Sequence, residues 1–382
     1  MTYQDKLGVY RVGDLKFYSK LEAIKMHTKT GIHLHWDFNE PVFSSYDWTT
    51  EPAESLLDLY RQRAQQLREK YDYIILAYSG GADSQNILDC FVNNNIKIDE
   101  LVSFINYEAT GDKDNFLNAE AYRVSIPTAE RLKSKHPWIK HRVLDLTKII
   151  LDLFKQKETL FSWVYEVNNF FNPNCVARAG LPLKIKEWSD IIYSGKKLCV
   201  LWGMEKPRVC QINGKFVFRF LDFIDNAATV KSIANQQPYT DELFYWTPDL
   251  PKIVIKQAHL IKNYLANPNV KQLPFVSKEK SELAYRDIGG ERFWLNNHGV
   301  NSIIYPTWNI DTFSYGKHNT IVLSPRDTWF FNIEDQALEK YHWRAGFEHL
   351  RTIVPNYWWN KSPDHWAQGI KGCWSKSYIL EK

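Results

Sequence analysis

Residues 71–90 read YDYIILAYSGGADSQNILDC, and this stretch decides the fold that we expect. Its first half is a short apolar run with no charge after Asp72, and its second half returns to apolar residues at helical spacing. Two adjacent glycines, flanked by hydroxyl side chains, stand between the halves. The pattern predicts a buried strand that turns directly into an amphipathic helix.

Strands and helices are expected to alternate on both sides of this stretch. An amphipathic helix is predicted within TTEPAESLLDLYRQRAQQLREKYD, and the strand KKLCVLWGM closes the series. Between them we predict helices at about 83–94, 116–135 and 147–157, and strands at ELVSFIN and KHRVLDL. This alternation indicates an α/β fold with a doubly wound, mainly parallel sheet covered on both faces.

The carboxyl ends of parallel strands meet at one edge of a sheet, where ligands bind. We therefore expect three stretches to lie together at that edge: Ser79–Ser84, Phe104–Tyr107 and Gly203–Arg208. The strand pattern stops near Asp225, and the long helical stretch DLPKIVIKQAHLIKNYL follows it. We expect three regions: a β-rich segment at 1–50, the α/β domain at 51–225, and a helical, aromatic-rich region at 226–382.

The composition is that of a globular protein, with 44% hydrophobic and 24% charged residues. A net charge of +4 does not by itself indicate nucleic acid as a partner. There is no apolar stretch long enough for a signal peptide or a membrane span, so we expect a cytoplasmic protein. Eight of the 15 tryptophans follow Arg292, and they either fill a core or form a stacking surface.

Metal and disulfide signals are weak. The five cysteines are scattered and never form a Cys-x-x-Cys pair, which argues against a disulfide framework or a thiolate zinc site. His33 and His35 would share one face of a strand, but no third ligand accompanies them.

The glycine segment has the chemistry of an anion site. Backbone amides at the start of a helix point at one spot, and glycine permits close approach there. Ser79 and Ser84 add hydroxyl donors, and Asp83 can hold a magnesium ion. The segment has neither the lysine and spacing of GxxxxGK[ST] nor the pattern GxGxxG. A glycine turn that merely links a strand to a helix is the alternative.

The stretch AYSGGADS resembles the SGGxDS signature of the PP-loop, or N-type, ATP pyrophosphatases, with all five specified positions matched. This superfamily includes GMP synthetase, NAD synthetase, asparagine synthetase and PAPS reductase. The resemblance covers about 70–225 and implies the adenine nucleotide alpha hydrolase-like fold. It also implies that ATP is cleaved to AMP and pyrophosphate, that an acceptor is adenylylated, and that a nitrogen or sulfur nucleophile then displaces AMP.

On this resemblance the pyrophosphate and Mg²⁺ site is formed by Ser79, Gly80, Gly81, Asp83 and Ser84. The release of pyrophosphate needs cations to neutralise its charge, and the stretch LWGMEKPRV offers Lys206 and Arg208 as catalytic residues, with Glu205 as a second magnesium ligand. Ordinary solvated charges are the alternative for these three. Phe104, Ile105 and Asn106 stand where the superfamily contacts adenine, although Phe104 also fits plain strand core.

Two differences from the motifs of known family members reduce the number of reactions that we expect. Cys373 in IKGCWSKSY does not match the cysteine motif of PAPS reductases, and no cysteine precedes Cys90 to serve a glutaminase domain. We expect a stand-alone, AMP-forming ligase-like enzyme for a small-molecule or nucleotide substrate, supplied with nitrogen or sulfur directly or by a separate donor protein. A nucleobase- or tRNA-modifying enzyme, a PAPS-reductase-like enzyme on the same fold and a non-catalytic nucleotide-binding module are the alternatives.

We expect the C-terminal region to shape the substrate pocket. The polar residues that it offers are Tyr245, Asp249, Lys256, Gln257 and His259, of which Asp249 could instead cap a helix.

Overall fold

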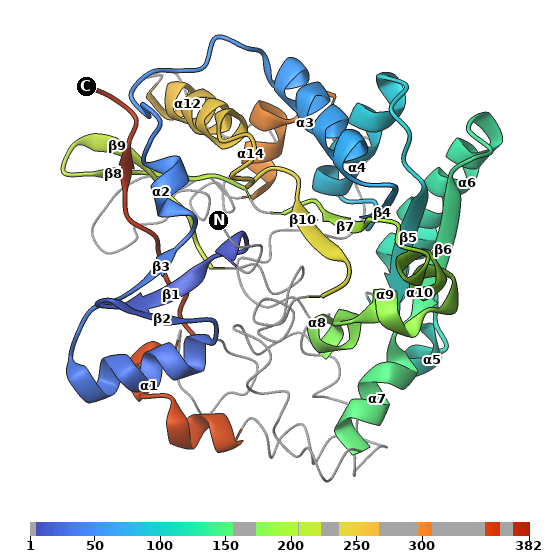
Figure 1. Cartoon of the computed structure of the whole chain (residues 1–382), viewed down its shortest axis with the longest axis horizontal. Coiled ribbons are helices and arrows are strands. Elements are labelled where there is room, and N and C mark those ends of the chain that lie inside the picture. The colour runs from blue at the N-terminus through green and yellow to red at the C-terminus, as the bar shows by residue number, and fades with distance from the viewer. Residues whose placement is uncertain are drawn as a thin grey trace.

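The computed structural model describes residues 5–115, 117–155, 173–204, 206–222, 237–266, 297–307, 348–359 and 370–382. A parallel sheet of five strands stands at its centre, in the order β10-β7-β4-β5-β6 (Figure 1). Every neighbouring pair is parallel. The strands are β4 (Tyr73–Ala77), β5 (Glu100–Ile105), β6 (Lys140–Asp145), β7 (Leu198–Trp202) and β10 (Thr240–Leu243). The predicted α/β class is confirmed.

Helices flank this sheet, with α3 (Leu56–Lys70) above it and α10 (Lys186–Tyr193) below it in Figure 1. Arg63 of α3 reaches Glu242 of β10 at 2.8 Å, and the indole of Trp188 in α10 donates to Glu100 of β5 at 2.8 Å. The other helices of this part are α4 (Ala82–Asn93), α5 (Tyr107–Thr110), the π-helix η2 (Ala121–Ser125), α6 (Ile126–Lys135), α7 (Thr147–Lys155), α8 (Pro173–Arg178) and α9 (Leu181–Lys184).

The order of the strands creates a switch point. From β4 the chain moves outward through β5 to β6, then returns to place β7 on the other side of β4 and β10 beyond it. The loops after β4 and β7 therefore leave in opposite directions from neighbouring strands. In doubly wound sheets, ligands bind in the crevice outside the carboxyl ends of the strands at such a point.

Most of the predicted elements are present, with two corrections. The helix expected over 116–135 begins at Ala121 and opens as a π-helix, and residue 116 lies outside the described residues. The sheet does not end near Asp225, because β10 extends it. The sequence TDEL of β10 has no apolar run by which a strand could be predicted. Its charged Glu242 can be buried because Arg63 and Lys70 neutralise it.

The N-terminal segment forms a three-stranded antiparallel sheet of order β2-β1-β3. Its strands are β1 (Val9–Val12), β2 (Leu15–Phe17) and β3 (Leu34–Asp37), and β1 and β2 form an antiparallel hairpin on either side of Gly13-Asp14. A helix that was not predicted, α1 (Lys20–Thr30), connects β2 to β3, and the short α2 (Glu40–Phe43) follows. The rings of His33 and His35 stack at 6.4 Å.

A third sheet, β11-β9-β8, is antiparallel and joins the end of the chain to its middle. It consists of β8 (Arg208–Ile212), β9 (Lys215–Arg219) and β11 (Tyr378–Ile379). An aromatic cluster connects it to the N-terminal segment, formed by Phe38, Phe43, Trp48, Phe218, Phe220, Trp246 and Tyr378. The remaining elements are α12 (Lys252–Ala266), α14 (Asn297–Ile304) and the 3-10 turn η6 (Asn356–Trp358). None of the described helices has the length and apolar character needed to cross a membrane.

Candidate functional site

The glycine loop connects β4 to α4 at the switch point. The backbone amide of Gly81, the N-cap of α4, donates to Ser79 Oγ at 3.2 Å, and Ser84 Oγ donates to the Gly81 carbonyl at 3.1 Å. The two serine hydroxyl oxygens lie 3.3 Å apart. The N-cap glycine offers no side chain to the amides of the first turn, which also lack intrahelical acceptors. Hydroxyl and amide donors thus gather at one end of a helix, where the dipole favours an anion.

Two glycines bring backbones into close contact at this loop. Gly80 has a φ of +79°, and a Cβ there would lie 2.9 Å from the amide nitrogen of Ser125 in η2. A Cβ on Gly203, which follows β7, would lie 3.1 Å from both the carbonyl carbon of Asp83 and the amide nitrogen of Ser84. The chain leaving β7 therefore passes directly beside the first turn of α4. This agrees with the expectation that Ser79–Ser84 and Gly203–Arg208 lie together at one edge of the sheet.

Asp83 is the point where four segments of the chain meet. Its Oδ2 accepts from Lys206 Nζ at 2.8 Å, and its Oδ1 accepts from the hydroxyl of Tyr305. Its backbone carbonyl accepts from the hydroxyl of Tyr245 at 2.8 Å, and that hydroxyl in turn accepts from Asn86 Nδ2 at 3.0 Å. The side chain of Asp83 keeps 29% exposure, so the carboxylate can still be reached from solvent.

The tyrosines behind the loop form a buried group. The rings of Tyr245 and Tyr305 lie 5.4 Å apart, and that of Tyr60 lies 5.6 Å from Tyr245. Burial, followed by the charge of Asp83, raises the pKa of Tyr305 well above its usual value. Burial also raises the pKa of Tyr245. Both hydroxyls therefore remain protonated and act as donors. Tyr245 was among the predicted polar residues of the C-terminal region, whereas Tyr305 was missed because no local motif marks it.

The residues predicted to contact adenine lie at the end of β5. The half-buried ring of Phe104 lies 6.4 Å from that of Trp202 at an interplanar angle of 13°, and the Arg178 guanidinium lies 4.8 Å from the Phe104 centroid. Trp202 donates its indole N–H to Asp241 at 2.9 Å, and burial raises the pKa of Asp241 to about 7. Ile105 is buried. Phe104 at the end of β5 therefore packs against the buried ring of Trp202 at the end of β7 and the guanidinium of Arg178.

Asn106 holds its own loop together. Its backbone N–H donates to Asn118 Oδ1 at 2.8 Å, and its Nδ2 donates to Asn174 Oδ1 at 3.0 Å. Asn118 also donates to the carbonyl of Asp112 at 2.9 Å and to the hydroxyl of Thr110 at 3.0 Å. The side chain that was predicted to contact a base therefore links the end of β5 to α8, while the backbone of Asn106 is held by Asn118.

The structure describes two of the three charged residues that were predicted to act after β7. Lys206 contacts Asp83 as described above. Arg208 is buried at the first position of β8, opposite Arg219 in the antiparallel register. Glu205, the predicted second magnesium ligand, lies outside the described residues.

The other polar residues predicted in the C-terminal region fasten α12 to the preceding chain. Lys256 pairs with Glu51 at 2.7 Å, and His259 Nε2 lies 2.9 Å from the carbonyl of Trp48. Gln257 donates to the hydroxyl of Tyr60 at 2.8 Å.

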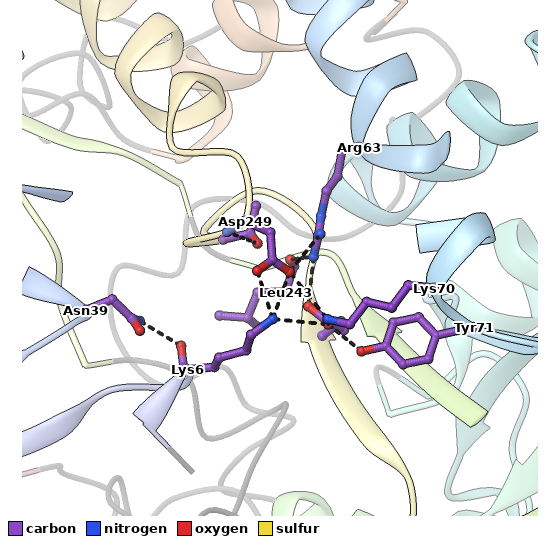
Figure 2. A network of polar contacts seen from close by, with 9 residues as sticks. Lys6, Asn39, Arg63, Lys70, Tyr71, Leu243 and Asp249 are labelled. Carbon is purple, nitrogen blue, oxygen red and sulfur yellow. Dashed lines mark hydrogen bonds and ion pairs between the residues drawn. The ribbon is translucent and has the colours of Figure 1, made fainter. Parts of the chain in front are cut away.

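Asp249 belongs to a separate charge network, drawn in Figure 2. It accepts from Lys6 at 2.7 Å, while Glu242 accepts from Arg63 at 2.8 Å and from Lys70 at 2.7 Å. The network joins the N-terminal segment, α3, β10 and the loop before α12. It therefore ties these four segments to one another.

The donor set at the loop suits a magnesium–nucleotide complex. Among the described residues, no three His, Cys, Asp or Glu side chains gather as a metal cluster. Asp83 contributes one carboxylate to the loop. Magnesium in nucleotide sites is usually held by one or two carboxylates together with phosphate oxygens and water. The chain matches no model of a known protein family and no curated protein. Support for a function therefore comes from the residues of the site.

Proposed function

We propose that the chain is an ATP pyrophosphatase of the PP-loop type, with the adenine nucleotide alpha hydrolase-like variant of the α/β fold. One observation carries the proposal. The segment Ser79–Ser84 lies at the switch point between β4 and β7, and Lys206 from beyond β7 contacts Asp83 of this segment at 2.8 Å. A plain turn between a strand and a helix would need neither this lysine nor the pair of hydroxyls.

The roles that we propose for the loop residues and Lys206 follow from the hydrogen-bond donors and charges that they carry. The hydroxyls of Ser79 and Ser84, with the amides around Gly80 and Gly81, are suited to hold the β- and γ-phosphates of ATP. Lys206 neutralises the negative charge that builds up on the departing pyrophosphate. Asp83 would hold a magnesium ion, which would supply positive charge to neutralise the phosphates. Arg208 and Glu205 remain predicted partners of the same phosphates and metal.

The base of the nucleotide is proposed to lie at the end of β5. Phe104 and Trp202 present nearly parallel rings there, and Ile105 and Asn106 supply the adjoining backbone. Aromatic surfaces stabilise planar bases by stacking, and backbone groups can recognise the edge of adenine. Phosphates at the start of α4 and a base near Phe104 would together orient the α-phosphate toward an acceptor.

The acceptor is proposed to be a small molecule or a nucleotide. Of the late tryptophans, the structure describes Trp358, Trp359 and Trp374, and all three are buried or half-buried. These three therefore offer no exposed row for stacking a nucleic acid. Burial raises the pKa of the Cys373 thiol, so this cysteine is unsuited to deliver sulfur. The nitrogen or sulfur nucleophile is expected to come from solution or from a donor protein.

The test is to incubate the protein with α-labelled ATP, magnesium and pooled acceptors, with ammonia, amines or sulfide present. AMP and pyrophosphate are the expected products. The variant Asp83→Asn should lose AMP release, whereas Asp152→Asn, which alters an exposed acid paired with Lys148 on α7, should retain it. ADP as the sole nucleotide product would overturn the proposal. Binding of ATP without any turnover would favour the non-catalytic alternative.

A further inference from the structure

Each oxygen of the Asp83 carboxylate already has one donor from the protein. Lys206 approaches Oδ2 at 2.8 Å, and the hydroxyl of Tyr305 donates to Oδ1. A carboxylate oxygen has about two lone pairs, so each oxygen keeps one for a further partner. The two donors together fix the rotation of the carboxylate. They come from two distant parts of the sequence, one after β7 and one after α14.

Tyr305 is itself held in place. It is buried, and its amide donates to the Asn301 carbonyl at 3.0 Å, which continues the last turn of α14. The hydroxyl of Tyr60 donates to the carbonyl of Ile304 at 2.7 Å, which fixes the backbone just before Tyr305. The Tyr305 ring also packs against that of Tyr245 at 5.4 Å. The donor is thus preorganised by α3, α14 and the segment after β10, as precise sites require.

We propose that Tyr305 is a positioning residue for Asp83, which orients the carboxylate toward the divalent cation of a metal–nucleotide complex. This inference rests on the proposed function. It makes the C-terminal part of the chain a component of the loop site, although the sequence motif lies entirely within residues 79–84. Partners that orient a metal ligand commonly contribute about 10- to 100-fold to metal affinity or activity.

The matched control is Tyr73. Its hydroxyl donates to Glu100 at 2.8 Å, at the opposite end of the sheet from the loop. Tyr305→Phe and Tyr73→Phe therefore each remove one hydrogen bond from a tyrosine to a carboxylate. Thermal unfolding of both variants shows whether either loses the fold. Tyr60→Phe is a second test, because it loosens the backbone before Tyr305 and leaves the Tyr305 hydroxyl in place.

The experiment measures Mn²⁺ binding by electron paramagnetic resonance in the presence of α,β-methylene-ATP, which cannot be cleaved between these phosphates. Tyr305→Phe should weaken Mn²⁺ binding about 10-fold or more, and Tyr60→Phe should weaken it by a smaller factor. Tyr73→Phe should stay within about twofold of the unaltered chain, since it lies outside the site. Unchanged binding in both Tyr305→Phe and Tyr60→Phe would overturn the inference. Tighter binding in Tyr305→Phe would also overturn it, because Tyr305 would then block the metal.

Activity separates this inference from the proposed function. If AMP is formed, Tyr305→Phe should raise the Mg²⁺ concentration for half-maximal rate, and the rate should recover at saturating Mg²⁺. If the unaltered chain binds Mn²⁺ and nucleotide but never forms AMP, the proposed function fails, whereas a loss of Mn²⁺ affinity in Tyr305→Phe still supports the positioning role. If the unaltered chain binds no Mn²⁺ with nucleotide, both fail.

Discussion

Lys206 and Asp83 form an ion pair of 2.8 Å across the switch point of the parallel sheet, although 123 residues separate them in sequence. The pair is partly exposed, with 13% of the lysine side chain and 29% of the aspartate side chain accessible. Its ammonium group lies beside the first turn of α4, where the loop gathers amide and hydroxyl donors. A phosphate entering this turn would therefore meet a cation that is already held in position.

Replacing Lys206 by methionine should affect catalysis far more than stability. Removing one preorganised donor to developing charge typically lowers a rate about 10²- to 10³-fold. A partly exposed ion pair contributes only about 0–1 kcal/mol to folding. We therefore expect Lys206→Met to lose most AMP release while its free energy of unfolding changes by less than about 1 kcal/mol.

The control for this variant is Lys186→Met, because Lys186 forms an exposed ion pair with Asp190 at 2.6 Å on α10. Its activity and stability should both match those of the unaltered chain. An AMP-forming rate of Lys206→Met equal to that of Lys186→Met would show that Lys206 has no catalytic role.

Gly80→Ala should destabilise the fold through two separate effects. Gly80 has a φ of +79°, and the new Cβ would lie 2.9 Å from the Ser125 amide nitrogen. The left-handed backbone costs about 1–2 kcal/mol for alanine, and forcing extra atoms into a packed contact costs about 1–3 kcal/mol more. Gly195→Ala isolates the first effect, since Gly195 has a φ of +84° and a Cβ there would meet no described atom within 4 Å. Equal losses in urea denaturation would contradict the close packing of the loop on η2.

The sequence predicts the centre of the fold because the three inner strands, β4, β5 and β7, are largely buried on both faces. Stretches such as YIILA in β4 and LCVLW in β7 are apolar throughout, and helices of clear period separate them. The convergence of Ser79–Ser84 with Gly203–Arg208 follows from parallel strand direction alone. The contact of Lys206 with Asp83 joins these two stretches.

Contacts between distant polar residues could not be predicted in this way. Arg63 is buried in α3 although its type favours exposure, while the apolar Leu57 of the same helix is 56% exposed. The reason for the burial of Arg63 is Glu242, whose carboxylate neutralises it from a strand 179 residues later. Tyr305 is likewise 222 residues from Asp83. Local periodicity carries no information about such pairs.

The charge network of Figure 2 should make stability depend on acid pH. Burial alone would raise the pKa of Glu242, but the charges of Arg63 and of two lysines outweigh it and lower that pKa from 4.5 to about 2. A depressed pKa in the folded state means that the stabilisation is present above pH 4.5 and is lost as the pH falls toward about 2. The loss over this range should be of the order of 3 kcal/mol.

Glu242→Gln tests this dependence. The variant should be less stable than the unaltered chain at pH 7, and the difference should shrink between about pH 4.5 and pH 2. Urea denaturation at a series of pH values measures it. Parallel stability curves for the two chains across this range would refute the ionised state of Glu242 in the folded protein.

The buried ion pair between Lys20 and Asp222 should be far more sensitive than an exposed pair to removal of one partner. Lys20 Nζ lies 2.8 Å from Asp222 Oδ2, and both side chains are at most 1% exposed. Asp222 also accepts from the hydroxyl of Tyr10 at 2.9 Å and from the amide of Cys373 at 2.8 Å, so it joins the N-terminal sheet to the C-terminal chain. Lys20→Met leaves a buried carboxylate without its cation, which typically costs about 3–5 kcal/mol. Lys148→Met, which breaks an exposed pair with Asp152 at 2.6 Å, should lose less than about 1 kcal/mol. Similar midpoints of thermal unfolding for the two variants would show that the buried pair does not hold these segments together.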